Sequence, residues 1–209
     1  MKKIRRLLGR RRKLKPPAET KLNILCKDKK YRKRKRWDAI IDRLPNNVHL
    51  IGAEIGVLNG NTSFRLLGAR PLLIHYMIDP WIAPEKGSSY LKSGDDNALK
   101  PARAHEGAYK KTLKRVEFAG CRAVILRMFS HEAVLKIKDA SLDFVFIDGD
   151  HSYDGVKKDI NLWTCKVKKS GWIGGHDYNH PRLPGVKKAV DEVFNNLELD
   201  DNRTWFVRL

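Results

Sequence analysis

Residues 144–153 read Phe144-Val-Phe-Ile-Asp148-Gly-Asp150-His151-Ser-Tyr153, and they are the clearest indication of the architecture of this chain. The segment 142–147 is nearly all apolar, which is typical of a central strand buried on both faces of a parallel sheet. The abrupt change to acids, glycine and histidine marks the end of that strand. Ligands of such sheets bind beyond the carboxyl ends of the strands, so Asp148, Asp150 and His151 are candidate site residues.

Short apolar segments of the same kind recur on both sides of this stretch, separated by segments with helical patterns. The alternation predicts an α/β fold: a Rossmann-like, seven-stranded, mostly parallel sheet with helices on both faces and a C-terminal antiparallel hairpin. The predicted strands cover about 48–55, 72–78, 123–127, 142–147, 172–175, 197–199 and 204–209. The predicted helices cover about 29–44, 61–69, 105–118, 132–137, 154–166 and 186–195.

Positive charge is concentrated at one end of the chain. Of the 43 Lys and Arg residues, 18 lie in residues 1–36 beside only two acids, whereas residues 37–209 are almost neutral. We therefore divide the chain into a basic arm, 1–36, which we expect to be flexible, and a body, 37–209. An arm of this kind contacts polyanions such as nucleic acid, anionic lipid or a charged glycan, or it is only a solvated leader. The sequence leaves both interpretations open.

Several classes of protein are excluded. No apolar run approaches the roughly 20 residues that a membrane helix needs, so no transmembrane segment is expected. The first ten residues lack the apolar segment of a secretory signal. Cys26, Cys121 and Cys165 are odd in number and lack metal-like spacing, which favours a reducing compartment. The predicted location is cytoplasmic.

Two other strand ends carry candidate binding residues. The stretch Glu54-Ile-Gly56-Val-Leu-Asn-Gly60 follows the first predicted strand, and its glycines let the backbone approach a ligand closely. The acid in front of them suits a cationic ligand better than a phosphate. Asp79 ends the second predicted strand, where an acid usually binds ribose hydroxyls. The glycine spacing fits neither a nicotinamide-binding loop nor a phosphate loop, which disfavours a dehydrogenase.

A further group of polar residues follows the fifth predicted strand. His176 and Asp177 lie there, and this strand should neighbour the one that ends at Asp148. Carboxylate and imidazole groups suit a divalent cation such as magnesium, manganese or iron. Asp148, His176 and Asp177 are therefore candidate metal ligands, and the alternative is a hydrogen-bonded polar rim.

With these segments in order, residues 48–209 resemble class I S-adenosylmethionine-dependent methyltransferases. The segment 146–153 together with the later Gly174-Gly-His176-Asp177 is the specific part. It looks like the group that includes the macrocin-type sugar O-methyltransferases. It is similar, more distantly, to the metal-dependent catechol and caffeoyl-coenzyme A O-methyltransferases.

The resemblance implies a role for each matching position. His176 and Asp177 replace an Asp-Asn pair of the metal-dependent enzymes, and His151 replaces a Lys that acts as the base. Asp148 falls at their first metal Asp and is also counted among the cofactor-binding residues. The implied cofactor positions are Glu54, Gly56 and Gly60 around the methionine part, Asp79 at the ribose with Trp81 nearby, and Met128, Phe129 and Ser130 at the adenine.

The function implied by the resemblance is O-methylation of a hydroxyl on a small-molecule or glycan acceptor, with S-adenosylmethionine as the methyl donor and Mg2+ or another divalent cation as a candidate helper. His151, or Asp150 behind it, would take the proton. The long loop 82–103 is placed to close over the site as a lid. Two alternatives stay open: an RNA methyltransferase that recruits its substrate through the arm, and a nucleic-acid-binding protein that uses a methyltransferase-like platform.

Overall fold

The structure is a computed structural model in which residues 34–209 are described. The predicted arm lies outside the described residues except for Arg34, Lys35 and Arg36, which lead into the first helix of the body. The division of the chain at residue 36 therefore stays a prediction. None of the helices in the described part combines the length and the apolarity that crossing a bilayer requires.

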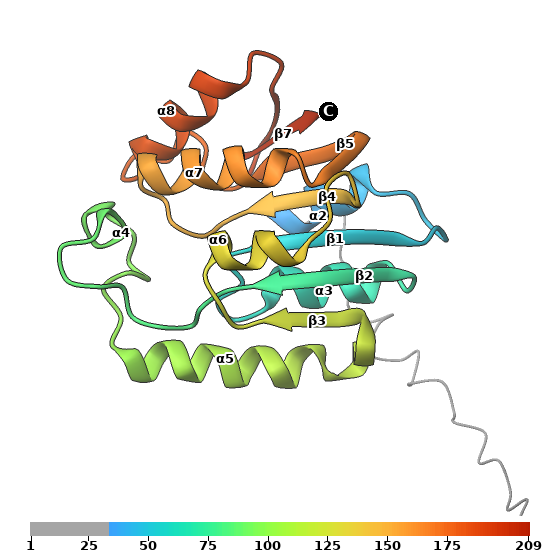
Figure 1. The fold of residues 1–209 in the computed structure, drawn as a ribbon, viewed down its shortest axis with the longest axis horizontal. Coiled ribbons are helices and arrows are strands. Elements are labelled where there is room, and N and C mark those ends of the chain that lie inside the picture. The colour runs from blue at the N-terminus through green and yellow to red at the C-terminus, as the bar shows by residue number, and fades with distance from the viewer. Residues whose placement is uncertain (1–33) are drawn as a thin grey trace, which may run out of the picture. The chain divides into compact units, whose positions relative to one another are not determined.

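Within residues 34–209, seven strands form one sheet in the order β3-β2-β1-β4-β5-β7-β6 (Figure 1). The first five strands pair in parallel, and β7 runs antiparallel to both β5 and β6. The predicted fold class, including the closing hairpin, is confirmed. The strands are β1 (Leu50–Ile55), β2 (Leu73–Ile78), β3 (Ala123–Leu126), β4 (Leu142–Ile147), β5 (Val167–Gly175), β6 (Glu198–Asp200) and β7 (Thr204–Arg208).

Helices cover both faces of the sheet (Figure 1). One face is covered by α2 (Arg36–Arg43), α3 (Asn61–Ala69) and α5 (Ala102–Val116), and the other by α6 (Ser130–Ala133), α7 (Tyr153–Thr164) and α8 (Pro184–Val193). Three short elements complete the described part: α4 (Ser89–Lys92) and the 3-10 helices η1 (Glu117–Arg122) and η2 (Val134–Lys136).

The strand β4 lies in the middle of the hydrophobic core. Val145 and Ile147 contact the side of α7 and α8, whereas Phe144 and Phe146 contact the side of α2 and α3. Successive strand residues point to opposite faces, so a strand buried on both faces must be apolar throughout. This arrangement explains the continuous apolar run from which the fold was predicted.

The first helix is shorter than predicted within the described residues. It begins at Arg36, and it ends before Pro45 because the residue preceding a proline disfavours the helical conformation. Ile40 and Leu44 are buried and Ile41 packs beside them, so the apolar side of this helix faces the core.

Two other boundaries differ for local reasons. β5 begins at Val167, five residues before the predicted start, and its exposed Lys169 and Ser170 hide it from an apolar pattern. α8 begins at Pro184, since proline lacks the N–H that the first turn of a helix leaves unused.

The registers of the parallel strands bring the predicted site residues into one row. Ile78, Ile55 and Ile147 pair across β2, β1 and β4, and Ile147 pairs with Gly175 of β5. The residues that come next in each strand are Asp79, Gly56, Asp148 and His176. The sheet therefore gathers side chains from four distant parts of the sequence at its carboxyl edge.

Gly56 generates a testable prediction about stability. Its φ is +87°, and a Cβ would lie 2.2 Å from the Asp148 carbonyl oxygen, which is backbone and cannot turn aside. We expect Gly56→Ala to lower the free energy of unfolding by at least about 2 kcal/mol, measured by urea denaturation. The matched control is Gly107→Ala in the exposed middle of α5, where a Cβ meets nothing within 4 Å. This control should raise the stability by about 0.5–1 kcal/mol, and equal effects of the two changes would contradict the prediction.

Candidate active site

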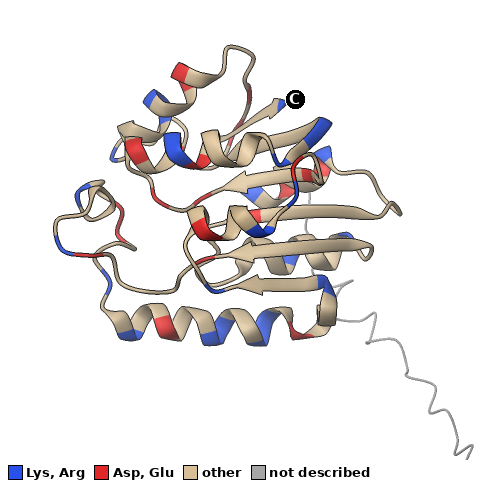
Figure 2. Cartoon of the chain, in the orientation of Figure 1, with Lys and Arg blue, Asp and Glu red and all other residues tan. Residues whose placement is uncertain are grey.

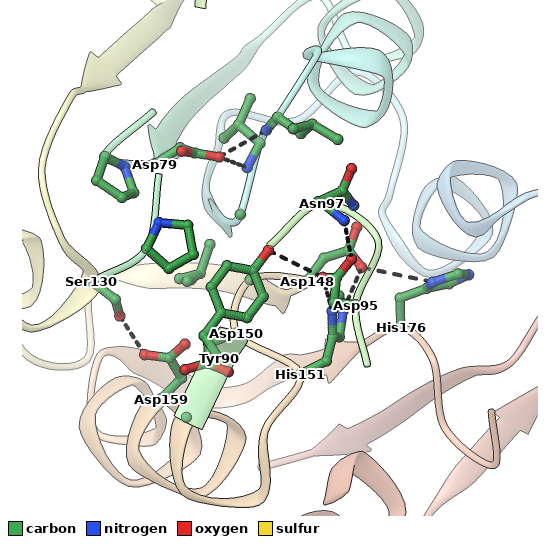
Figure 3. A pocket seen from close by; sticks show the side chains of 18 of the residues that line it. Asp79, Tyr90, Asp95, Asn97, Ser130, Asp148, Asp150, His151, Asp159 and His176 are labelled. Carbon is green, nitrogen blue, oxygen red and sulfur yellow. Dashed lines mark hydrogen bonds and ion pairs between the residues drawn. The ribbon is translucent and has the colours of Figure 1, made fainter. Parts of the chain in front are cut away.

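The carboxyl edge of the sheet opens into a cavity of about 890 Å3 (Figure 3). This volume is in the range of small-molecule and cofactor sites, which is about 300–1,000 Å3. Acidic residues mark the segments that follow β2 and β4 and the segment around α4 (Figure 2). The predicted site residues that line the cavity are Glu54, Gly56, Asp79, Phe129, Ser130, Asp148, Asp150, His151, His176 and Asp177.

Three predicted residues do not line the cavity. Gly60 is buried at the start of α3 with φ +68°, and Met128 packs against the core. Trp81 is 1% exposed, packs against Tyr109 with the two rings tilted by 53°, and donates its indole N–H to the Leu58 carbonyl at 2.8 Å. Its φ of +48° turns the chain at this point. The structure therefore places Trp81 behind the loop that follows β1, where it supports the loop from the core.

The carboxylate of Asp79 holds the loop that follows β1. One oxygen accepts the amide hydrogens of Val57 and Leu58 at 3.0 and 2.9 Å, and the other accepts that of Trp81 at 2.7 Å. Burial raises the pKa of Asp79, and these three hydrogen bonds oppose the rise. The predicted ribose-binding acid thus also fixes the backbone of the predicted methionine-binding loop.

Glu54 lies one residue before the end of β1 and is 1% exposed. Its carboxylate accepts a short hydrogen bond from the Ser63 hydroxyl in α3, and His75 Nε2 of β2 is 3.5 Å away. The side chain therefore joins the end of β1 to the first turn of α3 at the wall of the cavity.

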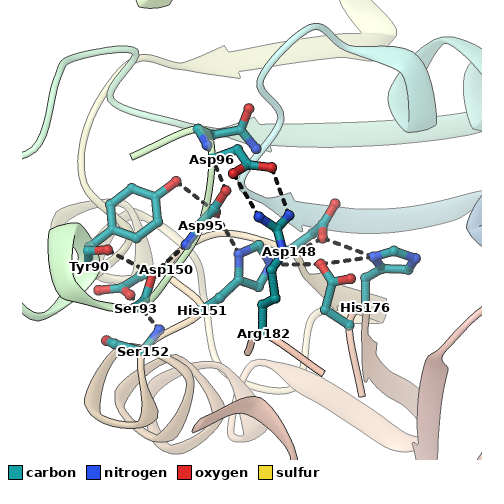
Figure 4. Close-up of polar contacts among 12 residues, drawn as sticks. Tyr90, Ser93, Asp95, Asp96, Asp148, Asp150, His151, Ser152, His176 and Arg182 are labelled. Atoms are coloured by element: carbon teal, nitrogen blue, oxygen red, sulfur yellow. Dashed lines mark hydrogen bonds and ion pairs between the residues drawn. The ribbon is translucent and has the colours of Figure 1, made fainter. Parts of the chain in front are cut away.

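His151 is the centre of the polar cluster (Figure 4). Its Nδ1 lies 2.7 Å from Asp95, and its Nε2 lies 3.5 Å from Asp148 and 3.3 Å from Asp177. The side chain is buried, and Nε2 makes no hydrogen bond of its own to these carboxylates. Burial alone would lower the pKa of His151, but its attraction to Asp148, Asp95 and Asp177 raises the pKa to about 10. The three carboxylates therefore hold the imidazole in its charged form.

Asp177 is the second residue after β5, and its backbone has a positive φ of +60°. Burial would raise its pKa, but the neighbouring His176 and His151 lower it to about 2. His176 Nδ1 lies 3.1 Å from the Asp177 carboxylate and 3.7 Å from that of Asp148.

The three residues that lie close enough together to bind a metal ion differ in one member from the three predicted ligands. Atoms of Asp148, His151 and Asp177 lie within 4.8 Å of one another, a spacing that a divalent ion can bridge. His176, the predicted third ligand, lies at the rim of this group. The family resemblance implied a base at His151 because this position falls where the metal-dependent enzymes carry a Lys. In the structure its Nε2 lies beside both Asp148 and Asp177.

Arg36 is a site residue that the sequence interpretation assigned to the arm. Its Nη1 donates to the Asp148 carboxylate at 2.5 Å and lies 3.2 Å from His176 Nδ1. The charge of Asp148 raises the pKa of Arg36, although burial opposes the rise. A cation therefore already accompanies Asp148 in this structure.

Asp150 belongs to the start of α7 as well as to the cavity. Its carboxylate accepts the amide hydrogen of Ser152 at 2.8 Å, and the Ser152 hydroxyl accepts that of Gly155 at 3.1 Å. These contacts satisfy amide groups that the first turn of a helix leaves free.

The segment between β2 and α5 forms one wall of the cavity, as the predicted lid would. Asp95 of this segment is 7% exposed and accepts hydrogen bonds from the Tyr90 hydroxyl at 3.1 Å and the Asn97 amide at 2.7 Å. Next to it, Asp96 pairs with Arg182 on the surface through two contacts of 2.9 and 2.7 Å. Neither acid follows a strand, so no sequence signal marked them.

Asp159 of α7 is a second residue that the sequence interpretation missed. The Ser130 hydroxyl donates to its carboxylate at 2.5 Å, and the Trp163 indole donates to the same hydroxyl at 2.8 Å. Burial raises the pKa of Asp159 to about 7. A polar residue inside the apolar periodicity of a helix is the signal that was available for it.

Comparison with known proteins defines the class. Residues 53–178 match the family described as a methyltransferase domain, and the chain belongs to that family. A protein of Acanthamoeba polyphaga mimivirus, described as uncharacterized, is 33% identical over 93 residues. That match covers 40% of this chain and 42% of the relative, so it spans less than half of the relative's length.

Solved structures share the fold at low identity. The calicheamicin methyltransferase CalS11 has a TM-score of 0.60 at 15% identity, covering 82% of this chain and 76% of its own. The O-methyltransferase NovP has a TM-score of 0.60 at 16% identity, covering 82% and 74%. The precorrin-6y C5,15-methyltransferase from Geobacter metallireducens has a TM-score of 0.56 at 14% identity, covering 86% and 94%. The predicted resemblance to class I methyltransferases is confirmed.

The raised pKa of Asp159 predicts a pH-dependent stability. Between about pH 4 and pH 7 the folded state keeps a proton that the unfolded state has lost, so stability falls as the pH rises. The slope for one group is at most about 1.4 kcal/mol per pH unit. We expect Asp159→Asn to flatten this part of the profile, measured by denaturation at each pH. An unchanged profile would show that Asp159 ionises normally.

The contact between Asp95 and His151 generates a second prediction. Removal of the buried carboxylate in Asp95→Ala should lower the pKa of His151 from about 10 by about one unit or more, measured by NMR titration of the imidazole ring. The control Asp96→Ala removes the exposed neighbour, whose partner is Arg182, and should leave this pKa unchanged. Equal shifts in both variants would contradict the assigned contact.

Proposed function

We propose that this chain is an S-adenosylmethionine-dependent methyltransferase that methylates a hydroxyl group of a small molecule or sugar. The observation that carries the proposal is the cavity at the carboxyl edge of the sheet, where Glu54, Asp79 and Asp148 line one space. Membership of the methyltransferase family supports it. Two structural neighbours, NovP and CalS11, are described as an O-methyltransferase and as a TDP-rhamnose 3'-O-methyltransferase.

The charge of the cavity supports a cationic cofactor. S-Adenosylmethionine supplies a methyl group on a positively charged sulfur. Carboxylates from β1, β2 and β4 surround the cavity, and such groups attract a positive charge in a partly buried site. Because Gly56 has no side chain, the backbone of this loop lies close to the backbone of Asp148. Asp79 holds the amides of the next two residues, Val57 and Leu58, in place.

The adenine end of the cofactor would lie at the wall formed after β3. Phe129 offers an aromatic face that is 44% exposed, and Ser130 beside it is fixed by Asp159 and Trp163. We therefore add Asp159 to the proposed cofactor-binding residues. Met128 and Trp81 support this region from the core and are not proposed to touch the cofactor.

Methyl transfer depends mainly on alignment of the acceptor oxygen with the methyl group and the sulfur. Such alignment contributes several kcal/mol and up to about 7–11 kcal/mol in the best cases. Tyr90 and Asp95 belong to one wall of the cavity, and the Asp96–Arg182 pair joins this wall to the segment after β5.

His151 is the proposed proton acceptor, and the charges of the neighbouring carboxylates decide whether it can lose its own proton first. With Asp95, Asp148 and Asp177 all negative, the imidazole keeps its proton. A positive charge that neutralises Asp148 or Asp177 removes part of that attraction and frees His151 Nε2 to accept a proton from a hydroxyl. Asp150 lines the same space and is the second candidate for this role.

The cluster also fits a divalent cation. His151 Nε2 is buried without a hydrogen bond and faces two carboxylates, while Asp95 fixes the other ring nitrogen. In metal sites, a carboxylate that is hydrogen-bonded to one ring nitrogen orients the histidine so that the other nitrogen can bind the ion. Asp148, His151 and Asp177 would hold the ion, with His176 adjacent. His151 Nε2 would then be a ligand, so Asp150, which lines the same space, would take the proton in the cation-bound protein. A bound divalent ion would lower the pKa of an acceptor hydroxyl and fix its position.

The proposal is tested by separating cofactor binding from turnover. Asp79→Ala removes three hydrogen bonds from the proposed cofactor loop, so its affinity for S-adenosylhomocysteine in calorimetry should fall at least about tenfold. Asp148→Asn should keep that affinity within about threefold while abolishing transfer of labelled methyl groups to a panel of catechols and nucleotide sugars.

The matched control is Asp139→Asn, which changes an exposed acid that pairs with Lys166 away from the cavity and should leave both measurements unchanged. A wild-type protein without affinity for S-adenosylhomocysteine would refute the proposal. Methyl transfer to RNA instead of the small acceptors would correct the acceptor class.

A further inference from the structure

Arg36 lies before residues 53–178, which match the methyltransferase family, yet it lines the cavity. It is the first residue of α2, and its side chain reaches across to the end of β4. Arg36 therefore lies outside the matched segment, and the family match does not account for its place in the cavity.

The guanidinium of Arg36 contacts two of the three residues that the sequence nominates as metal ligands. Nη1 lies 2.5 Å from Asp148 Oδ2 and 3.2 Å from His176 Nδ1. The other Asp148 oxygen, Oδ1, lies 3.5 Å from His151 Nε2. Asp148 thus faces Arg36 with one oxygen and the candidate cation position with the other.

A second, independent observation points to a ligand at this position. His151 is 7% exposed, and its Nε2 makes no hydrogen bond, although the carboxylates of Asp148 and Asp177 face it at 3.5 and 3.3 Å. A metal ion between these groups would bind Nε2 directly once the imidazole has given up its proton.

We propose that Arg36 and a divalent cation compete for Asp148, so that binding of the cation between Asp148, His151 and Asp177 displaces the Arg36 guanidinium. Two positive charges within a few ångströms repel strongly in a partly buried site, and the carboxylate that holds one no longer holds the other as tightly. The inference rests on the cation site named in the proposed function.

The structure provides a way for the side chain to leave without unfolding the helix. Arg34, two residues earlier, forms ion pairs with Asp42 at 2.8 Å and with Asp200 at 2.9 Å. These pairs hold the backbone just before α2. The long side chain of Arg36 is 29% exposed, so it has solvent on one side to move into.

The test is the affinity for Mn2+ alone, measured by calorimetry and by the electron paramagnetic resonance of free Mn2+. Arg36→Met removes the charge without adding a ligand atom, and it should tighten Mn2+ binding by about tenfold or more relative to the wild type. Arg36→Lys keeps a positive charge and should stay within about threefold of the wild type. Asp148→Asn should abolish binding in either background.

The matched control is Arg34→Met, which removes a neighbouring arginine whose partners, Asp42 and Asp200, lie outside the cavity lining. Its Mn2+ affinity should equal that of the wild type, and thermal unfolding would show that each variant is folded. Equal Mn2+ affinities of the wild type and Arg36→Met, or no binding by either, would overturn the inference.

Binding of S-adenosylhomocysteine, measured in the same samples, distinguishes this failure from failure of the proposed function. A protein that binds S-adenosylhomocysteine but shows no Arg36 effect on Mn2+ would still be a methyltransferase candidate. A protein that shows the Arg36 effect without binding S-adenosylhomocysteine would retain the cation site and lose the proposed activity.

Discussion

Charge balance at the carboxyl edge of the sheet governs the arrangement of the site. Asp95, Asp148 and Asp177 surround one buried imidazole, and Arg36 approaches from the other side of Asp148. Carboxylates at this spacing repel unless cations lie between them, and a buried imidazolium is unfavourable unless carboxylates surround it. The charge state of each residue therefore depends on the others, and a positively charged ligand in the cavity changes the electrostatic interactions of all of them.

The sequence was sufficient to predict the sheet and the residues that directly follow its parallel strands. Hydrophobic runs reveal strands, and the carboxyl ends of parallel strands meet at one edge, so Gly56, Asp79, Asp148 and His176 could be placed together before the structure was known. The site residues that the sequence did not predict do not directly follow a parallel strand. Asp95 and Asp159 lie in a connecting segment and in a helix, and Arg36 comes from a run of basic residues in which no single one stands out.

Trp81 shows the opposite case, a residue that the family resemblance implied near the ribose and that does not line the cavity. It follows Asp79 by two residues, but its positive φ directs the chain so that the indole lies in the core against Tyr109. Local backbone conformation decided which way the side chain faced, and composition and periodicity carry no information on that choice. The fold likewise leaves the acceptor atom open, since the structural neighbours include enzymes described as O-methyltransferases and a precorrin methyltransferase.

The Asp96–Arg182 pair that fastens the cavity wall is more than 60% exposed on both sides. Pairs of this kind are screened by dissolved ions, and the screening length is about 8 Å at physiological ionic strength. The ion pairs around His151 are buried, so dissolved ions screen them much less. High salt therefore weakens the Asp96–Arg182 pair, whereas the groups around His151 keep their geometry. Entry and release of small molecules should then depend on ionic strength, while the chemical step should not.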